Sequence, residues 1–117
     1  MENANIRTGR YGEQQAVLHL EMLGHQILHL NWKYRRWEID IISCFGQVLH
    51  FTEVKTRMGQ AYGLPENAVN HKKMNSMQRA AAAYLELHPQ WKRISFDILA
   101  IDLSGGNTDI RYFEDIS

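Results

Sequence analysis

Asp40, Glu53 and Lys55 are the residues whose types and spacing could perform chemistry together. Two carboxylates that lie close to each other repel, and a divalent cation would remove that repulsion. Ligands that are all oxygen atoms suit Mg²⁺ or Mn²⁺ better than zinc. A lysine on the same face would add an ammonium group to these two carboxylates. Whether these three side chains meet depends on the strands that carry them.

Two strands joined by a hairpin are predicted around these residues. Glu38–Ile42 and Val48–Val54 have the composition of strands, and Phe45-Gly46 between them is typical of a turn. Both faces of the hairpin carry apolar residues, which indicates a central position in a sheet, where a charge needs a partner or a metal. A common solvated strand pattern is the alternative interpretation.

The predicted register brings the charged groups together. With Phe45-Gly46 as a two-residue loop, Asp40 lies opposite Phe51 and Glu38 lies opposite Glu53. Asp40 and Glu53 then become diagonal neighbours on one face, within ~8 Å of each other. Side chains alternate along a strand, so Lys55 shares the face of Glu53.

The remaining elements predict one mixed α/β layer structure in the order α-β-β-β-α-β-β. The first helix carries an apolar stripe that begins one turn after Glu13, and Gly24 is a suitable C-cap. Pro89 ends the second helix. The predicted helices span residues 10–23 and 66–87, and the predicted strands span 26–30, 38–42, 48–54, 94–103 and 110–113.

Length and composition limit what the chain can be. It has 117 residues, 44% of them hydrophobic, so we expect a single domain over residues 1–117. We find no apolar run long enough for a membrane span and expect no secretory signal at the N-terminus. Cys44 is the only cysteine, which excludes an internal disulfide and fits a cytoplasmic location.

The formal net charge is zero, because 13 Lys and Arg residues balance 13 Asp and Glu residues. This balance argues against a protein that holds nucleic acid by bulk charge alone. The charges are nevertheless unevenly spread, with a basic middle and an acidic C-terminal end. A local basic surface is therefore compatible with neutrality.

Basic residues alternate with aromatic residues between Trp32 and Trp37. This pattern suits phosphate contacts and base stacking. The alternative is a hairpin whose aromatic rings are core and whose bases are solvated. Lys72 and Lys73, near the start of the second helix, could hold a phosphate or form a solvated helical face.

Two other chemistries are disfavoured. The six histidines show no metal-binding spacing on one helix, and one cysteine cannot complete a zinc–thiolate site. Cys44 has no evident activating base and is not expected to be a nucleophile.

Most of the chain resembles the YraN-like family of small bacterial predicted endonucleases, which is related to archaeal-type Holliday junction resolvases. The order of the matching segments is that of the family, and Trp37 stands where the family pattern has glycine. The matching segments are Gly9–Glu13, Asn31–Lys33, Glu38–Ile42, Phe51–Arg57, Tyr62–Pro65, Ala68-Val69, Lys72, Phe96-Asp97 and Asp102.

This resemblance implies a restriction-endonuclease-like core, with a central mixed β-sheet flanked by helices. It implies that Asp40 and Glu53 bind Mg²⁺ or Mn²⁺ and that Glu13 brings a further acid to the catalytic site. Lys55 would orient the attacking water, and we favour positioning over general base catalysis because neighbouring carboxylates should keep a lysine protonated. The residues expected to contact nucleic acid are Arg10, Lys33, Arg35, Arg36, Trp37, Arg57 and Lys72.

The leading hypothesis is a metal-dependent endonuclease acting on branched or structured nucleic acid, with DNA expected rather than RNA. The resemblance to resolvases also implies a homodimer. One alternative is a nucleic-acid-binding module on the same fold that does not catalyse cleavage. Another is a protein-interaction domain that uses the acidic C-terminal end.

Overall fold

A computed structural model describes residues 4–57, 71–103 and 106–116, with side chains from residue 9 onward. The predicted order of elements is confirmed, although several strands are longer than expected. The part of the predicted second helix at 66–70 lies outside the described residues, as do Ser104 and Gly105 of the predicted last turn. The elements are α1 (Ala4–Met22), β1 (Gln26–Tyr34), β2 (Trp37–Phe45), β3 (Val48–Arg57), α2 (His71–Leu87), β4 (Arg93–Asp102) and β5 (Asp109–Phe113).

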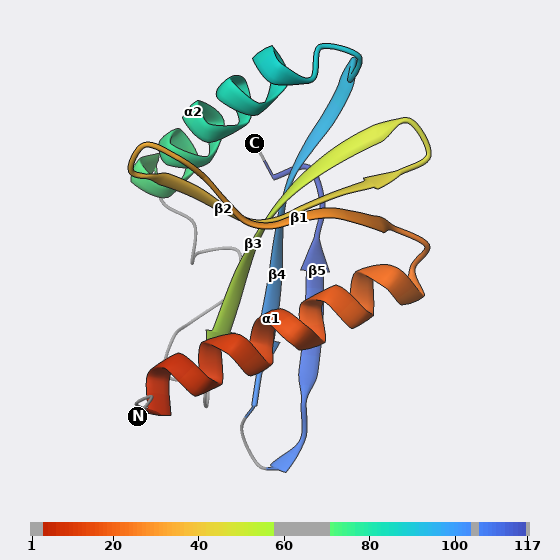
Figure 1. Ribbon diagram of the computed structural model, residues 1–117. Coiled ribbons are helices and arrows are strands. Elements are labelled where there is room, and N and C mark those ends of the chain that lie inside the picture. Colours follow the sequence, from red (N-terminus) through yellow and green to blue (C-terminus); the bar gives the residue numbers. More distant parts are fainter. Residues whose placement is uncertain (1–3, 58–70, 104–105, 117) are drawn as a thin grey trace.

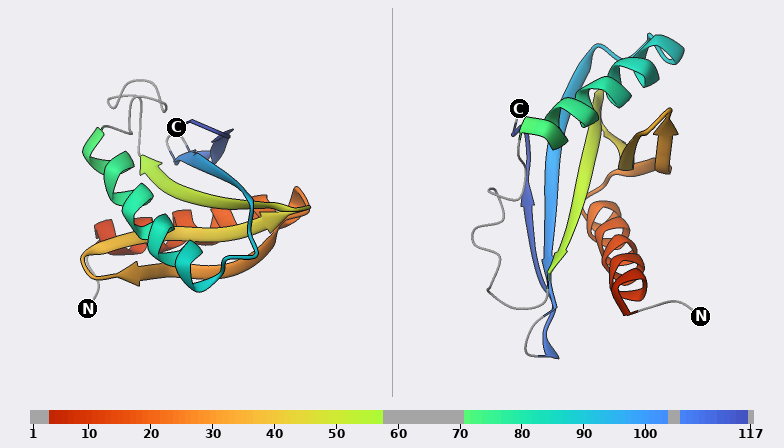
Figure 2. Two further views of the ribbon diagram at one scale, coloured as in Figure 1. Left: turned by 90° about the horizontal axis from the view of Figure 1, so that it is seen from above. Right: turned by 90° about the vertical axis from the view of Figure 1, so that its left-hand side faces the viewer.

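The strands form one mixed sheet in the order β1-β2-β3-β4-β5. β3 and β4 are parallel, and the other neighbouring pairs are antiparallel. The predicted last strand is thus confirmed at an edge of the sheet. Figure 1 shows that β3, β4 and β5 run side by side, whereas β1 and β2 cross them at an angle. The second view of Figure 2 shows the β1–β2 turn curling away from these three strands.

The predicted register of the central hairpin is wrong by two residues. Phe45 pairs with Val48, so Gly46 and Gln47 form the turn. Gly46 has a φ of 60°, a conformation that suits glycine, and this favours it as the first residue of the turn. A slip of two residues keeps every side chain on its face, because the side-chain period of a strand is two. The shared face of Asp40 and Glu53 therefore survives the correction.

Two apolar clusters cover the sheet. Phe51 and Phe96 stack and pack against Tyr84 and its neighbours on α2. On the other face, Ala16 and Leu20 of α1 pack against residues of β2 and β4. Each helix buries one apolar stripe, and the two helices thus pack on opposite faces of the sheet.

Helix α1 ends where the sequence predicts and approaches β3 very closely. Gly24 has a φ of 100°, and the N–H of His25 donates to the carbonyl of Leu20 across this left-handed C-cap. Nearer the start of α1, a Cβ on Gly12 would lie 1.9 Å from Oγ1 of Thr56 on β3. Glycine at position 12 therefore sets how near Glu13 comes to the sheet.

Gly9 and Gly12 of α1 should respond to alanine in opposite ways. Gly12→Ala should lower the free energy of unfolding by about 1–3 kcal/mol, since the new methyl group overlaps Thr56. Gly9→Ala should raise it by about 0.5–1 kcal/mol, because nothing lies within 4 Å of the added Cβ. Urea denaturation measures both. Equal effects of the two substitutions would contradict the close approach at Gly12.

Asp97 on β4 is fully buried and forms the centre of a polar network. Nδ1 of His50 lies 2.6 Å from Oδ2 of Asp97, and the hydroxyl of Tyr112 donates to the same oxygen. Oγ of Ser95 donates to Oδ1 at 2.5 Å, and the backbone N–H of Asp115 donates to it as well. Burial alone would raise the pKa of Asp97, but these hydrogen bonds lower it. The network joins β3, β4, β5 and the C-terminal segment.

Asp97→Asn should lower the free energy of unfolding by about 3 kcal/mol, because an amide cannot accept all the hydrogen bonds that this buried carboxylate accepts. Asp109→Asn is the control, since its exposed ion pair with Arg111 contributes little. Urea denaturation at pH 7 compares them. A loss below about 1 kcal/mol for Asp97→Asn would show that the network is not a major source of stability.

Candidate active site

The site lies where β2 and β3 stop pairing. Their backbone ladder ends at Ile41 and Thr52. Beyond it, the carboxylate of Asp40 accepts a hydrogen bond of 2.8 Å from the backbone N–H of Val54. The side chain of Asp40 thus occupies the place of a ladder partner, and β2 is free to diverge from β3. The charged residues gather in this divergence.

Asp40 is half-buried among other carboxylates. Burial, followed by the negative charge of Glu53, raises its pKa to about 7, although the bond from Val54 opposes this rise. Glu13 and Glu38 raise it further. A carboxyl group with a pKa near neutrality is typical of sites where a cation or a proton is exchanged.

The ammonium groups of two lysines lie close to the same carboxylate oxygen of Glu53. Nζ of Lys73 lies 2.5 Å from Oε1 of Glu53, and Nζ of Lys55 lies 3.6 Å from the same atom. Both side chains of the Glu53–Lys55 pair are only 12% exposed. The predicted convergence of Glu53 and Lys55 on one face is therefore observed.

Lys55 has a lower pKa than its neighbouring carboxylates suggested. Burial, followed by the adjacent ammonium of Lys73, lowers its pKa to about 8, against the opposing effect of Glu53. Lys55 still carries its proton for the most part at pH 7, as expected for a positioning group. The contact of Lys73 with Glu53 places a second ammonium group beside Lys55, and its effect adds to that of burial.

Lys73 is the site residue that the sequence interpretation missed. Burial alone would lower its pKa, but the hydrogen bonds to Glu53 and Lys55 and the negative charges of Glu53 and Asp40 together raise it. The signal was present in the helix: Met77, Ala80 and Tyr84 form a buried stripe, and one turn before Met77 along that stripe stands Lys73. Lys72, which was favoured instead, is exposed on another face of α2.

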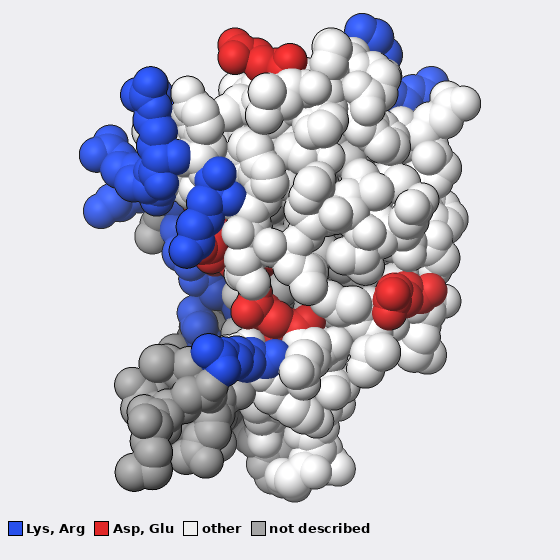
Figure 3. Space-filling view, viewed as in Figure 1, with Lys and Arg blue, Asp and Glu red and all other residues white. Residues whose placement is uncertain are grey.

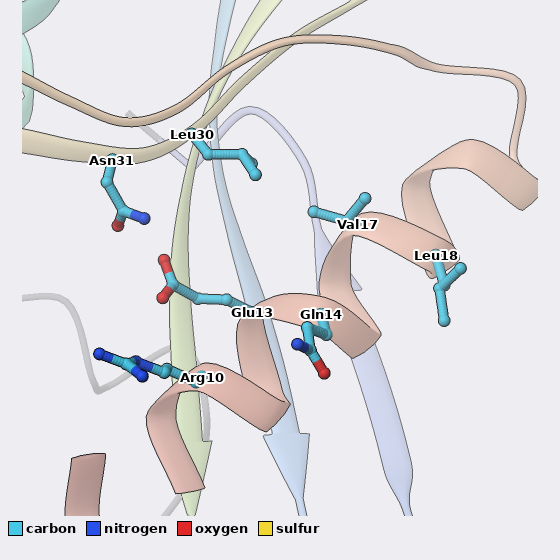
Figure 4. A pocket seen from close by; sticks show the side chains of 7 residues that line it. All are labelled: Arg10, Glu13, Gln14, Val17, Leu18, Leu30 and Asn31. Atoms are coloured by element: carbon cyan, nitrogen blue, oxygen red, sulfur yellow. The ribbon is translucent and has the colours of Figure 1, made fainter. Parts of the chain in front are cut away.

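Glu13 reaches the same region from α1. Burial, followed by the charge of Glu38, raises the pKa of Glu13, and a hydrogen bond from Asn31 partly opposes this rise. Its Oε1 atom is buried and has no hydrogen-bond partner among the described residues. Figure 4 shows the carboxylate pointing between Asn31 and Arg10. An orphaned buried oxygen of this kind indicates that a proton or a ligand is missing.

A mostly apolar pocket of about 600 Å³ lies between α1 and β1 beside Glu13 (Figure 4). Arg10 lines this pocket rather than standing apart on the surface. Its lining residues are Arg10, Glu13, Gln14, Val17, Leu18, Leu30 and Asn31.

The residues expected to contact nucleic acid fall into two groups. Arg35, Arg36 and Trp37 lie at the β1–β2 turn, where Arg35 has a φ of 58° and packs over Tyr34. The other group borders the carboxylates: Lys33 lies 3.5 Å from Glu38, and Arg57 at the end of β3 donates to the carbonyl of Thr56. In Figure 3, most of the Lys and Arg residues of this face lie along its left-hand edge, and some of the Asp and Glu residues lie directly beside them.

Comparison with known proteins decides the family. The profile of a family described as "Uncharacterised protein family UPF0102" matches residues 12–101. The chain belongs to the UPF0102 family. This is the YraN-like family that the sequence resembles. The description names no activity.

Curated UPF0102 proteins cover most of the chain. A UPF0102 protein of Rhodococcus opacus is 38% identical over 103 residues, 87% of each chain. One from Syntrophus aciditrophicus is 38% identical over 116 residues, covering 95% of this chain and 88% of its own. One from Parafrankia is 43% identical over 96 residues, 81% of each chain.

The acidic groups of the site can be compared with the arrangement that a metal ion needs. Within residues 4–57, 71–103 and 106–116, no group of three or more His, Cys, Asp or Glu side chains is arranged to hold a metal ion. Over the same residues, no helix is long and apolar enough to cross a membrane.

The pKa of Asp40 provides a direct test of this geometry. In metal-free protein, Asp40 should titrate near pH 7, and Glu53→Gln should lower its pKa because the nearest negative charge is removed. The carbon-13 shift of the Asp40 carboxyl group measures both. Asp109→Asn, on an exposed edge, should leave the titration unchanged. An Asp40 that titrates near pH 4 in the parent protein would contradict the buried cluster.

Proposed function

We propose that this UPF0102 protein is a Mg²⁺- or Mn²⁺-dependent endonuclease that hydrolyses phosphodiester bonds in branched or structured DNA. One observation carries the proposal: Asp40, Glu53, Lys55 and Glu13, from three separate elements, meet where β2 diverges from β3. Such a combination of carboxylates and lysine suits phosphoryl chemistry better than a structural role, because mutual repulsion of the carboxylates costs stability.

The donor set fits a hard divalent cation. Asp40 and Glu53 would hold it through their carboxylate oxygens. The raised pKa values of Asp40 and Glu13 and the unpartnered oxygen of Glu13 are what a missing positive charge produces. When bound, such a cation polarises a phosphoryl oxygen and lowers the pKa of a water molecule.

The chain's own residues supply the rest of the chemistry. Lys55 is protonated for the most part at pH 7 and would orient the attacking water or offset charge on the phosphate. Lys73 holds Glu53 in place through its hydrogen bond to Oε1. The Val54 N–H fixes the orientation of the Asp40 carboxylate.

Asp40→Asn and Glu53→Gln should each reduce cleavage by at least about 100-fold, because each removes a charged group needed for binding the cation. Cleavage of labelled four-way junctions, flaps and single strands in Mg²⁺ or Mn²⁺ measures this, and EDTA should abolish it. Glu21→Gln, on an exposed position of α1, is the control and should cleave like the parent. Full activity of the folded Asp40→Asn protein would refute the proposal.

A second candidate is a nucleic-acid-binding module without catalysis. The observation that favours it is the absence of a three-ligand group among the described residues, together with the engagement of Glu53 by Lys73. Calorimetry with Mn²⁺ separates the two candidates. Nucleic-acid binding without Mn²⁺ binding and without cleavage would establish the second.

The expected homodimer follows from the resemblance to resolvases, which act on two-fold symmetric junctions. Sedimentation of the full chain tests it. A monomer at tens of micromolar would count against resolvase-like action and would leave cleavage of other structures as the proposal.

A further inference from the structure

A basic hollow lies between the β1–β2 turn and α2, beside the candidate active site. Its volume is about 690 Å³. Three of its lining residues are cationic, and none is acidic. We call it the Trp37 hollow, and its lining residues are Arg36, Trp37, Lys72, Asn75, Ser76 and Arg79.

One face of helix α2 forms much of the lining of the Trp37 hollow. Four lining residues of α2 stand at positions i, i+3, i+4 and i+7, which lie on the same side of a helix: Lys72, Asn75, Ser76 and Arg79. Lys73 lies on a different stripe of α2, and its ammonium group donates a hydrogen bond to Glu53. One helix therefore serves the hollow with one face and the candidate active site with another.

Trp37 organises two of the cations. The guanidinium carbons of Arg36 and Arg79 each lie 5.5 Å from the centre of the Trp37 ring. Cation–π contacts of this kind hold the planar guanidinium groups in place. The ring also stacks on Tyr34, with 6.1 Å between centres, and packs against the core cluster. A glycine, which the family pattern has at this position, could make none of these contacts.

We propose that the Trp37 hollow binds a backbone phosphate of the nucleic acid at a point separate from the scissile bond. Two guanidinium groups and an ammonium, with the polar side chains of Asn75 and Ser76, match the charge and hydrogen-bonding needs of a phosphodiester. Trp37 already contacts Tyr34, Arg36 and Arg79, so it holds the cations rather than stacking on a base. The contact is therefore independent of sequence. This inference rests on the proposed action on nucleic acid.

The position of the hollow sets which phosphate it takes. Trp37 and Asp40 are three residues apart on β2, which corresponds to about 10 Å along an extended strand. Successive phosphates advance about 3.4 Å per nucleotide along a duplex axis. Successive phosphates of one strand lie further apart through space than this axial rise, so the hollow takes a phosphate at most about three nucleotides from the bond at Asp40 and Glu53. The substrate class is a strand that continues at least that far on one side of the cleaved bond.

Affinity measurements on matched variants test the anchor. In an Asp40→Asn background, anisotropy follows binding of a fluorescent four-way DNA junction at several salt concentrations. Arg79→Gln and Arg36→Gln should each weaken binding about tenfold and reduce the salt slope by about one. Arg93→Gln is the control, because exposed Arg93 pairs with Val48 at the opposite end of β3. Equal behaviour of Arg79→Gln and Arg93→Gln would overturn the proposal.

Neutral phosphates locate the contact. Junctions are made with a single methylphosphonate at successive positions from the branch. One position should weaken binding by the Arg79-containing protein and have no effect on the Arg79→Gln protein. The absence of any such position would overturn the anchor, as would binding of an acidic peptide that Arg79→Gln abolishes while junction affinity stays unchanged.

Cleavage assays separate failure of the anchor from failure of the proposed function. With Asp40 intact, Arg79→Gln should reach the parent's single-turnover rate at saturating junction, since it does not touch the reacting groups. If the parent cleaves and Arg79→Gln shows no loss of affinity, only the anchor is refuted. If no cleavage occurs but the methylphosphonate effect depends on Arg79, the anchor stands and the catalytic proposal fails.

Discussion

The hydrogen bond from the backbone N–H of Val54 to the carboxylate of Asp40 is the interaction on which the site depends. It satisfies a backbone donor at the point where β2 leaves β3, so the divergence of the two strands does not leave that group unpaired. The divergence in turn makes room for side chains from both helices. Glu13 approaches from α1, where Gly12 permits close packing on Thr56, and Lys73 approaches from α2.

The buried acids of the candidate active site and the buried Asp97 have pKa values that are shifted in opposite directions. Asp40 and Glu13 both have raised pKa values because they are buried among other carboxylates. Asp97 is buried more completely, yet its pKa is lowered because hydrogen bonds surround it. The contrast separates two uses of a buried acid in one sheet. Asp97 joins strands, whereas Asp40 lies against other carboxylates and a buried oxygen of Glu13 has no hydrogen-bond partner among the described residues, which is typical of groups that receive a ligand.

The hairpin shows how far sequence reasoning reached and where it failed. The strands around Asp40 and Glu53, their common face and the position of Lys55 were predictable because side chains alternate with a fixed period of two. The register of β2 against β3 was not predictable, because either Phe45-Gly46 or Gly46-Gln47 could form the turn. The pairing of Phe45 with Val48 and the φ of Gly46 in the folded chain distinguish the two turns. The resemblance to the family favoured Lys72 and not Lys73. The buried stripe of α2, which continues one turn back from Met77, nevertheless indicates Lys73.

The sequence by itself determined the order of elements, the family and which residues are candidates for the site, because periodicity and residue type are local properties. Only the tertiary structure decided which charges meet. Lys73 contacts Oε1 of Glu53, and burial together with this second ammonium group lowers the pKa of Lys55. Trp37 gathers Arg36 from a turn and Arg79 from a helix 42 residues further on. Such contacts depend on distances between elements remote in the chain, which no local pattern encodes.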